Sequence, residues 1–336
     1  MAVVHCRVVT VTLNDVFAAR QRIAPYVRRT PLIASDWLSR LCGARVSLKL
    51  ESLQPTHSFK VRGAFNAALQ MRGQRLVTPS TGNHGRATSF ATQTLGMQVV
   101  VFAPSTTPAV KLEGMRRNGA TLMTDAQTYD EAEAGALRYA EEHGHDPDPV
   151  RFLSSYSDER LIAATGTIAL EICEDDPRID TIVVPVGGGG LISGIALAAK
   201  AINPKMRVIG VEAANNPAMS TARKRGFVAN VEIQPTLADA IGGNNDPQTI
   251  TFDYMQRLVD DIVQVSEAEI AAAVRDLAGI DHVIAEGGGA VAGAALAARK
   301  IELSGSGSGS ERHVAAIVSG GNIDRPRLAK LLDGSV

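Results

Sequence analysis

Short apolar segments alternate with amphipathic segments along most of this chain. Thr12 and Asp15 have the spacing of a helix-capping pair, and apolar residues at helical intervals follow them as far as Pro25. This pattern predicts a first helix that ends near Pro25. Further helices are predicted at 61–72, 83–95 and 107–117, and strands at 46–51, 97–103, 180–186, 206–213 and 313–320.

The predicted strands are rich in β-branched residues, are apolar on both faces, and are separated by helical segments. Such strands belong to parallel sheets that helices cover on both sides, so the sequence predicts the α/β class. Two candidate boundaries lie near 73–75 and in the polar segment 143–150. They predict a small domain at 74–151, inserted into a large domain formed by residues 1–73 and 152–336.

The composition is that of an ordinary globular protein. The 34 Lys and Arg residues nearly balance the 35 Asp and Glu residues, which gives a net charge of -1. This balance argues against nucleic acid or an anionic membrane surface as a partner. No apolar run reaches the roughly 18 residues of a transmembrane helix. The Gly/Ser-rich segment 303–312 predicts a flexible surface loop.

The three cysteines, Cys6, Cys42 and Cys173, lie far apart in the sequence and form no CxxC or Cys/His cluster. This usage predicts neither a disulfide nor a zinc site, and it indicates a reducing compartment. The apolar N-terminal segment is interrupted by Arg7 and lacks the features of a secretion signal. The sequence therefore predicts a cytoplasmic protein.

Four consecutive glycines, Gly187, Gly188, Gly189 and Gly190, connect a predicted strand to an apolar helix. Their amides can converge on one point, and the helix N-terminus adds partial positive charge, so the loop can hold a phosphate or a similar anion. A tight turn is the alternative, although two glycines would suffice for it. The spacing differs from the GxGxxG of a dinucleotide site, which stays a weak alternative, and no GKS or GKT follows to make a P-loop.

The segment STGNHGRA lies at another predicted strand-to-helix junction. It contains Ser80, Thr81, Gly82, Asn83 and His84, whose hydroxyl, amide and free N–H groups can surround a carboxylate. A helix N-cap with a lone histidine is the alternative.

Three further motifs contain candidate functional residues. SFKVRGA places Lys60 behind Phe59 at the start of a predicted helix, where a lysine is more often a solvated charge. SGGNID places Ser319 at the carboxyl end of the last predicted strand, where open α/β sheets bind ligands. AEGGGAV places Glu286 before a glycine-rich helix, where a helix-terminal acid is the ordinary interpretation.

In this order, SFKVRGA, STGNHGRA, VGGGG and SGGN resemble the motifs of the fold type II pyridoxal-phosphate enzymes, the family of threonine and serine dehydratases, serine racemase and tryptophan synthase β. The resemblance covers nearly the whole chain. It implies two open, twisted, mostly parallel sheets flanked by helices, with pyridoxal 5'-phosphate as cofactor, an amino acid as substrate and a homodimer as the assembly. The chain ends soon after the last motif, so no C-terminal regulatory domain is expected.

The reaction that this resemblance implies is the β-elimination of a β-hydroxy amino acid such as threonine or serine, which gives a 2-keto acid and ammonia. Lys60 would bind the cofactor aldehyde covalently and later remove the substrate α-proton, which requires a neutral amine in a partly dry pocket. The other implied cofactor contacts are Phe59 at one ring face, Asn83 at the ring hydroxyl, Gly187 to Gly190 at the phosphate, Ser319 at the pyridine nitrogen, and Glu286. The implied site for the substrate carboxylate is Ser80, Thr81, Gly82, Asn83 and His84.

Some positions depart from the family pattern. Thr81 stands where serine racemases carry the serine that reprotonates the opposite substrate face, so racemisation is an alternative activity. Glu212 matches one ligand of the divalent-cation site of racemase-like members, but Ala218 replaces the second acid, so no metal is expected. STGNHGRA and ADAIGGNND look closest to the branch associated with hydroxyectoine utilisation. A dinucleotide-dependent oxidoreductase and a non-catalytic binding protein are the rival classes.

Overall fold

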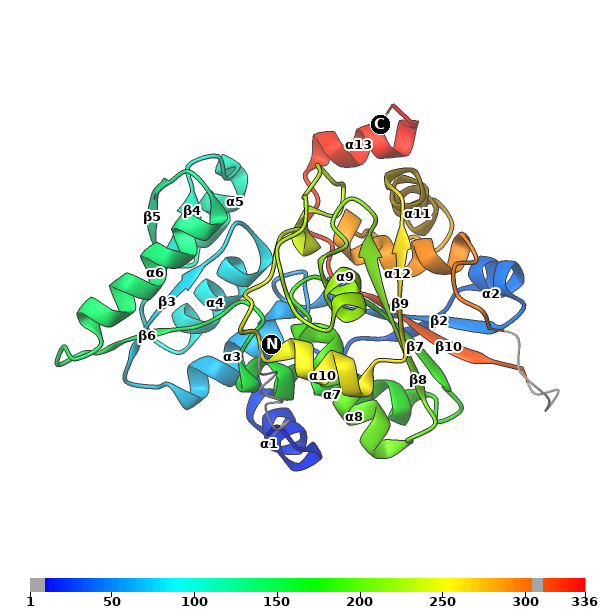
Figure 1. Cartoon of the computed structure of the whole chain (residues 1–336), viewed down its shortest axis with the longest axis horizontal. Helices are drawn as coiled ribbons and strands as arrows, with labels where there is room; N and C mark the ends of the chain where they lie inside the picture. Colours follow the sequence, from blue (N-terminus) through cyan, green and yellow to red (C-terminus); the bar gives the residue numbers. More distant parts are fainter. Residues whose placement is uncertain (1–9, 304–310, 336) are drawn as a thin grey trace.

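The computed structural model describes residues 10–303 and 311–335. Within them the chain forms two bodies that lie side by side, one around a six-stranded sheet and the other around a four-stranded sheet (Figure 1). The predicted loop centre at 304–310 and the N-terminal segment with Cys6 and Arg7 lie outside the described residues.

The six-stranded sheet is parallel except for its first strand. In spatial order its strands are β1 (Leu32–Ala34), β2 (Arg45–Leu50), β10 (His313–Val318), β7 (Thr181–Pro185), β8 (Arg207–Ala213) and β9 (Asp261–Val265). Only the β1–β2 pair is antiparallel. The side chains of β7 are buried throughout, and those of β8 and β10 are buried except at the first residue. This burial explains why these segments are apolar on both faces.

Helices cover both faces of this sheet. Ile182 and Val184 of β7 belong to one apolar cluster, and Val183 between them belongs to another, because side chains alternate along a strand. The first cluster includes α1 (Leu13–Ile23), α7 (Glu159–Asp175), α8 (Gly190–Ile202) and α10 (Thr251–Leu258). The second includes α2 (Asp36–Cys42), α11 (Glu267–Gly279), α12 (Gly287–Ala297) and one residue of α13 (Arg325–Asp333). The remaining elements of this body are α9 (Ala218–Arg225) and the single turns η1 (Glu51–Leu53) and η2 (Asp239–Ile241).

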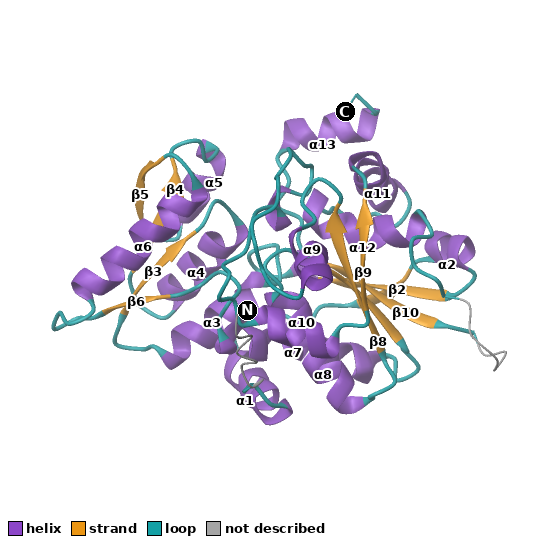
Figure 2. Cartoon of the chain, viewed as in Figure 1, coloured by secondary structure: helices purple, strands orange, loops and turns teal. Residues whose placement is uncertain are grey.

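The four-stranded sheet is wholly parallel (Figure 2). Its order is β5 (Thr121–Ala126), β4 (Val99–Pro104), β3 (Arg75–Pro79) and β6 (Val150–Phe152), and its helices are α4 (Asn83–Thr94), α5 (Ala109–Arg117) and α6 (Tyr129–His143). Helix α3 (Lys60–Gln70) packs against both α4 and α7. The first apolar cluster therefore continues from the large sheet to Leu76 and Val101 of the small one.

The α/β class and the two mostly parallel sheets are confirmed. The Thr12–Asp15 capping box is present, and the first helix ends at Ile23. All five predicted strands and three further predicted helices are found, with ends shifted by up to two residues. The strand implied before Ser80, for which no limits were predicted, is β3, and four strands were not predicted, namely β1, β5, β6 and β9. Two of them have only three residues, and β5 exposes every second residue at a sheet edge, so its apolar signal is weak. The domain limits at 74–151 stay a prediction.

Candidate functional site

A cavity of about 1480 Å³ lies between the two sheets, at the carboxyl ends of their strands. Its walls include the residues that follow β3, β7 and β10, as expected for ligand sites in open α/β sheets. The predicted site residues that line it are Lys60, Ser80, Thr81, Gly82, Asn83, His84, Gly188 and Glu286. Of the other predicted residues, Phe59, Gly187 and Gly189 are next to lining residues in the chain. Gly190 follows Gly189, and the carbonyl of Ser319 accepts from the N–H of Phe59. The structure therefore gathers five separate sequence motifs around one space.

Lys60 is the first residue of α3, and the end of β10 fixes its position. The N–H of Phe59 donates to the carbonyl of Ser319 at 3.0 Å, and the N–H of Gly321 donates to the carbonyl of His57 at 2.9 Å. These bonds join SFKVRGA to SGGNID, and they bring Ser319 beside the start of α3.

The Lys60 amine lies in a largely dry part of the cavity. Its Nζ donates to the carbonyl of Ser155 at 2.5 Å and lies 5.2 Å from the centre of the Phe59 ring. Burial lowers the pKa of Lys60 to about 8, because desolvation disfavours the charged ammonium. A substantial fraction of this amine is therefore neutral near physiological pH. A solvated lysine, which is the alternative interpretation of this residue, would be almost wholly charged at this pH.

Arg62 anchors the same helix through buried ion pairs. Its guanidinium donates to both carboxylate oxygens of Glu51 at 2.8 Å and also contacts Glu171 of α7. Lys49 of β2 pairs with Glu171 at 2.7 Å. Burial is the largest single influence and opposes ionisation of Glu51. The charge and hydrogen bonds of Arg62, with those of Thr30 and Lys49, together outweigh it and lower the pKa of Glu51. The network ties α3 to the large sheet and to α7, two residues away from Lys60.

The tetraglycine loop has no room for side chains. A Cβ at Gly188 would lie 2.2 Å from the ring of Tyr156, and one at Gly190 would lie 2.8 Å from the Tyr156 carbonyl oxygen. Gly189 has a φ of 82°, in the left-handed region that favours glycine. No side chain caps the N-terminus of α8, so its first N–H groups are available to an anion.

The loop from Ser80 to His84 is held by its own first residue. The Ser80 hydroxyl accepts from the N–H of Gly82 at 3.1 Å and from that of Gly85 at 2.8 Å. A Cβ at Gly85 would approach the Met115 sulfur to 2.5 Å, so the start of α4 lies close against α5. Ser80 therefore shapes the loop, while the exposed Thr81 lines the cavity.

The side chain of His84 is buried and neutral. Burial, together with the charge of Lys60, holds the pKa of His84 well below its usual value. The Thr78 hydroxyl donates to the carbonyl of Leu153, so it accepts from Nε2 of His84 at 2.9 Å. Nδ1 is then an acceptor, and it has no partner in the described chain. A carboxylate at this loop would therefore be bound by backbone N–H groups and not by the imidazole.

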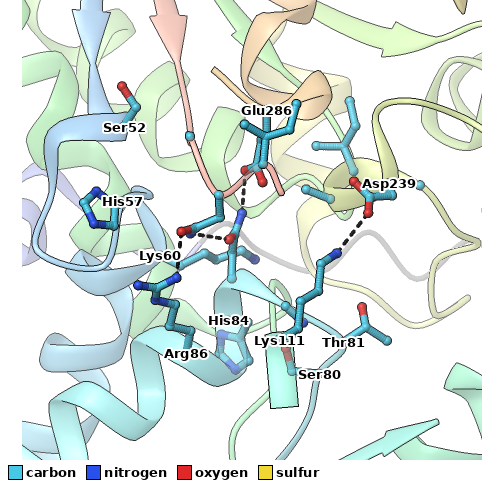
Figure 3. A pocket seen from close by; sticks show the side chains of 18 of the residues that line it. Ser52, His57, Lys60, Ser80, Thr81, His84, Arg86, Lys111, Asp239 and Glu286 are labelled. Atoms are coloured by element: carbon cyan, nitrogen blue, oxygen red, sulfur yellow. Dashed lines mark hydrogen bonds and ion pairs between the residues drawn. The ribbon is translucent and has the colours of Figure 1, made fainter. Parts of the chain in front are cut away.

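Asn83, Asn322, Arg86 and Glu286 form a hydrogen-bonded chain across the cavity wall (Figure 3). Burial raises the pKa of Glu286 to about 7, against the opposing effect of the Asn83 hydrogen bond. Arg86 and Asn322 lie within STGNHGRA and SGGNID, yet the sequence did not single them out as site residues. Ser155, Tyr156, Tyr129 and Lys111 also line the cavity, and no local pattern marks them. Asp239, which lines it too, lies in the segment ADAIGGNND.

Known proteins identify the family. A family model described as "Pyridoxal-phosphate dependent enzyme" matches residues 23–320. This chain belongs to that family.

Relatives of this pyridoxal-phosphate enzyme align along almost the whole chain. The L-threonine ammonia-lyase of Thermotoga maritima is 38% identical over 96% of this chain and 78% of its own length. The catabolic L-threonine dehydratase of Escherichia coli K12 is 35% identical over 96% of each chain. Maize serine racemase superposes with a TM-score of 0.87 at 31% identity, covering 97% of this chain and 98% of its own.

The residues present fit pyridoxal phosphate. An amine with a lowered pKa suits the cofactor aldehyde, because only the neutral amine attacks a carbonyl. A glycine loop without room for side chains, at an uncapped helix N-terminus, suits its phosphate. The dinucleotide alternative loses its basis, since the same loop belongs to a family with a different cofactor.

Glu212, which matches one ligand of the cation site of racemase-like members, has a structural role in this chain. Glu212, at the end of β8, accepts from the N–H groups of Met219 and Ser220 at 2.7 and 2.9 Å. It therefore caps α9, which begins at Ala218. Residues 10–303 and 311–335 contain no group of three or more His, Cys, Asp or Glu side chains placed to hold a metal ion.

The lowered pKa of Lys60 predicts how the cofactor-free protein takes up pyridoxal phosphate. Below a pH of about 8 the amine is mostly protonated, so the initial uptake rate should rise with pH and level off above a midpoint near 8. The measurement is the initial growth of visible absorbance after mixing, over a pH series. A midpoint near ~10.4, the value of a solvated lysine, would contradict the dry environment of Lys60.

Proposed function

We propose that this protein is an ammonia-lyase that uses pyridoxal phosphate to eliminate the β-hydroxyl group of an amino acid such as threonine or serine, releasing a 2-keto acid and ammonia. The observation that carries the proposal is the Lys60 amine, whose pKa of about 8 suits both cofactor binding and proton removal. The names of relatives that align over nearly the full chain support the same reaction.

The substrate carboxylate would be bound at the loop that opens α4. The Ser80 hydroxyl keeps the loop in shape by accepting from the N–H groups of Gly82 and Gly85. The first-turn N–H groups of Asn83 and His84, which no side chain caps, would be left for the carboxylate. This contact would place the α-carbon near Lys60, whose neutral amine would remove the α-proton. The Ser155 carbonyl, which accepts from Lys60 Nζ at 2.5 Å, would steady the amine before and after this transfer.

The chain's own groups would hold the cofactor as follows: Gly187 to Gly190 at the phosphate, Asn83 at the ring hydroxyl, Ser319 at the pyridine nitrogen and Phe59 against one ring face. When bound, pyridoxal phosphate supplies an electron sink for the charge left by the α-proton. The buried hydroxyl of Ser319 contacts the Gly288 carbonyl at 3.4 Å. The group beside the pyridine nitrogen of the cofactor would therefore be a neutral hydroxyl. Glu286 would face the cofactor through Asn83.

Thr81 favours racemisation as an accompanying activity. Its side chain is exposed and lines the same cavity as Lys60. A hydroxyl there could return a proton to the substrate face that Lys60 does not reach. The test is whether D-amino acid forms alongside keto acid, and whether Thr81→Ala abolishes only the former.

The central experiment compares wild type with Lys60→Ala. Purified wild type with pyridoxal phosphate should show a visible absorption band and should release keto acid from threonine or serine. Lys60→Ala should lose the band and nearly all turnover, because it lacks both the attachment point and the base. A conserved rate in Lys60→Ala would refute the assignment, and a band without keto acid from either substrate would refute the elimination.

We also propose that the substrate side chain carries a second amino group, as in the branch associated with hydroxyectoine utilisation. Tyr129 and Asp130, at the start of α6, line the cavity beside Ser155. The Tyr156 hydroxyl accepts from the N–H of Asp246 at 2.9 Å, which brings the loop that contains Asp246 to the same wall. Burial, and then the nearby charges of Asp246 and Asp130, raise the pKa of Glu133, so three carboxyl groups lie near one another beside this wall. Such a wall favours an ammonium group.

This charge predicts a selective effect of neutralisation. Asp130→Asn combined with Glu133→Gln should raise KM about three- to tenfold for 3-hydroxy-2,4-diaminobutyrate and leave KM for threonine unchanged. Glu141→Gln, on the exposed far end of α6, is the matched control. Equal KM changes for both substrates would contradict a charge-selective wall.

We further propose a cytoplasmic homodimer. No helix in the described part of the chain has the length and apolar character needed to cross a membrane. Leu53 and Ile284 line the cavity yet are each 45% exposed, and Gly321 brings their segments together. Such a patch suits a second copy of the chain. Sedimentation should give twice the monomer mass of 35.4 kDa, and Leu53→Glu should shift it toward the monomer.

A further inference from the structure

Three hydrogen bonds in series connect Arg86 to Glu286. Arg86 Nη1 donates to Oδ1 of Asn322 at 2.9 Å, and Nδ2 of Asn322 donates to Oδ1 of Asn83 at 2.7 Å. Nδ2 of Asn83 donates to Oε1 of Glu286 at 2.6 Å. The series crosses from α4 to the loop after β10, returns to α4 and ends at the start of α12.

The chemistry of arginine sets the direction of this series. A guanidinium has donors only, so the atom of Asn322 that meets Arg86 must be its oxygen. The Asn322 NH₂ group then faces the other way, and its two N–H groups go to Asn83 and to the carbonyl of Thr56 at 2.9 Å. Asn83 must accept with its oxygen, which directs its own NH₂ group toward Glu286. Neither amide can flip without placing donor against donor.

One N–H of Asn83 is left for a ligand. Its Nδ2 carries two hydrogens, and Glu286 takes one of them. In the described part of the chain Nδ2 has no second acceptor within hydrogen-bond distance. Asn83 lines the cavity that also contains Lys60. An oxygen that meets Asn83 from the cavity side can therefore receive a donated hydrogen bond.

We propose that Arg86 is a positioning residue, which orients Asn322 and through it Asn83, so that Asn83 donates an N–H to the ring hydroxyl oxygen of pyridoxal phosphate and favours its ionised form. This inference rests on the proposed place of Asn83 at that hydroxyl. With the opposite orientation, Asn83 would offer a carbonyl oxygen, which binds only a protonated hydroxyl.

The surroundings of Arg86 suit an orienting role better than a stabilising one. The guanidinium is half-buried, and burial lowers the pKa of Arg86. No carboxylate of the residues in 10–303 and 311–335 forms an ion pair with it, and its bond to Asn322 is to a neutral amide. A cation in this setting contributes little to folding stability.

The far end of the series is also fixed. A Cβ at Gly320 would lie 2.2 Å from Oε1 of Glu286, so the carboxylate packs directly on that backbone. The N–H of Glu286 donates to the Gly320 carbonyl at 3.1 Å. Asn83 is thus held between an acceptor that cannot move away and a donor, Asn322, whose direction Arg86 and the Thr56 carbonyl fix together.

The test is the absorption spectrum of the substrate-free holoenzyme. An ionised ring oxygen gives the visible band and a protonated one the near-ultraviolet band, so the band ratio reports its proton. Arg86→Leu should lower the visible-to-ultraviolet ratio about tenfold, the effect of losing one hydrogen bond to a charged group. Arg86→Lys, which keeps a cationic donor, should retain most of the wild-type ratio.

Asn322→Asp gives a second test at nearly constant volume. The new carboxylate can accept from Arg86 but cannot donate to Asn83, so the ratio should again fall. Arg325→Leu is the matched control, because Arg325 is an exposed cation that lines the cavity outside the series. If Arg86→Leu binds too little cofactor for a spectrum, Asn322→Asp decides the matter alone.

An unchanged band ratio in Asn322→Asp, at full cofactor content, would overturn the inference. A reduced ratio in Arg325→Leu as large as that in Arg86→Leu would do the same, since a general loss of cavity charge would then explain it. Keto-acid release by wild type is measured on the same samples. Turnover with unchanged spectra overturns only the role of Arg86, whereas a shifted ratio without turnover overturns only the elimination reaction.

Discussion

Burial of the Arg62 guanidinium between Glu51 and Glu171 is the interaction on which the geometry of the site depends. Arg62 and Glu51 are each at most 1% exposed. Taking such charges out of water is costly, and removing one partner of a buried pair typically costs about 3 to 5 kcal/mol. The start of α3 therefore has one low-energy position relative to β2 and α7, and Lys60 has that same position.

The network stabilises charged side chains, whereas the neighbouring cavity disfavours them. Lys60 and His84 both have lowered pKa values, and the pKa of Glu286 is raised, so burial favours the neutral form of each group. Lys60 and Glu286, with pKa values of about 8 and about 7, can each change protonation state near neutral pH at small cost in free energy, whereas His84 stays neutral. The buried ion pairs of Arg62 hold α3 in place, and the dry cavity wall keeps the Lys60 amine partly neutral and therefore reactive. The two environments are two residues apart on one helix.

Much of this could be predicted from the sequence, because local patterns carry it. Apolar strands identified the α/β class, and glycine runs at strand ends identified the loop at α8. Lys60 could be identified as a site residue only because SFKVRGA belongs to an ordered set of motifs. Nothing in the residue itself separates it from a surface lysine. The acceptor of its amine, the Ser155 carbonyl, has no sequence signature at all. The Arg86–Asn322 bond joins positions 236 residues apart, and side-chain direction decides it.

The short strand β6 has a consequence for how such a chain could have been assembled. The chain enters the small sheet at Arg75 and leaves it at Phe152, and Arg75 is paired with Val150 on the neighbouring parallel strand. Paired strands lie about 4.8 Å apart, so this segment begins and ends at adjacent points. A unit whose two ends meet can be spliced into a host fold at one site with little disturbance. The second wall of the cavity is thus a single chain segment, whose insertion into a sheet protein would leave the strand order of the large sheet intact.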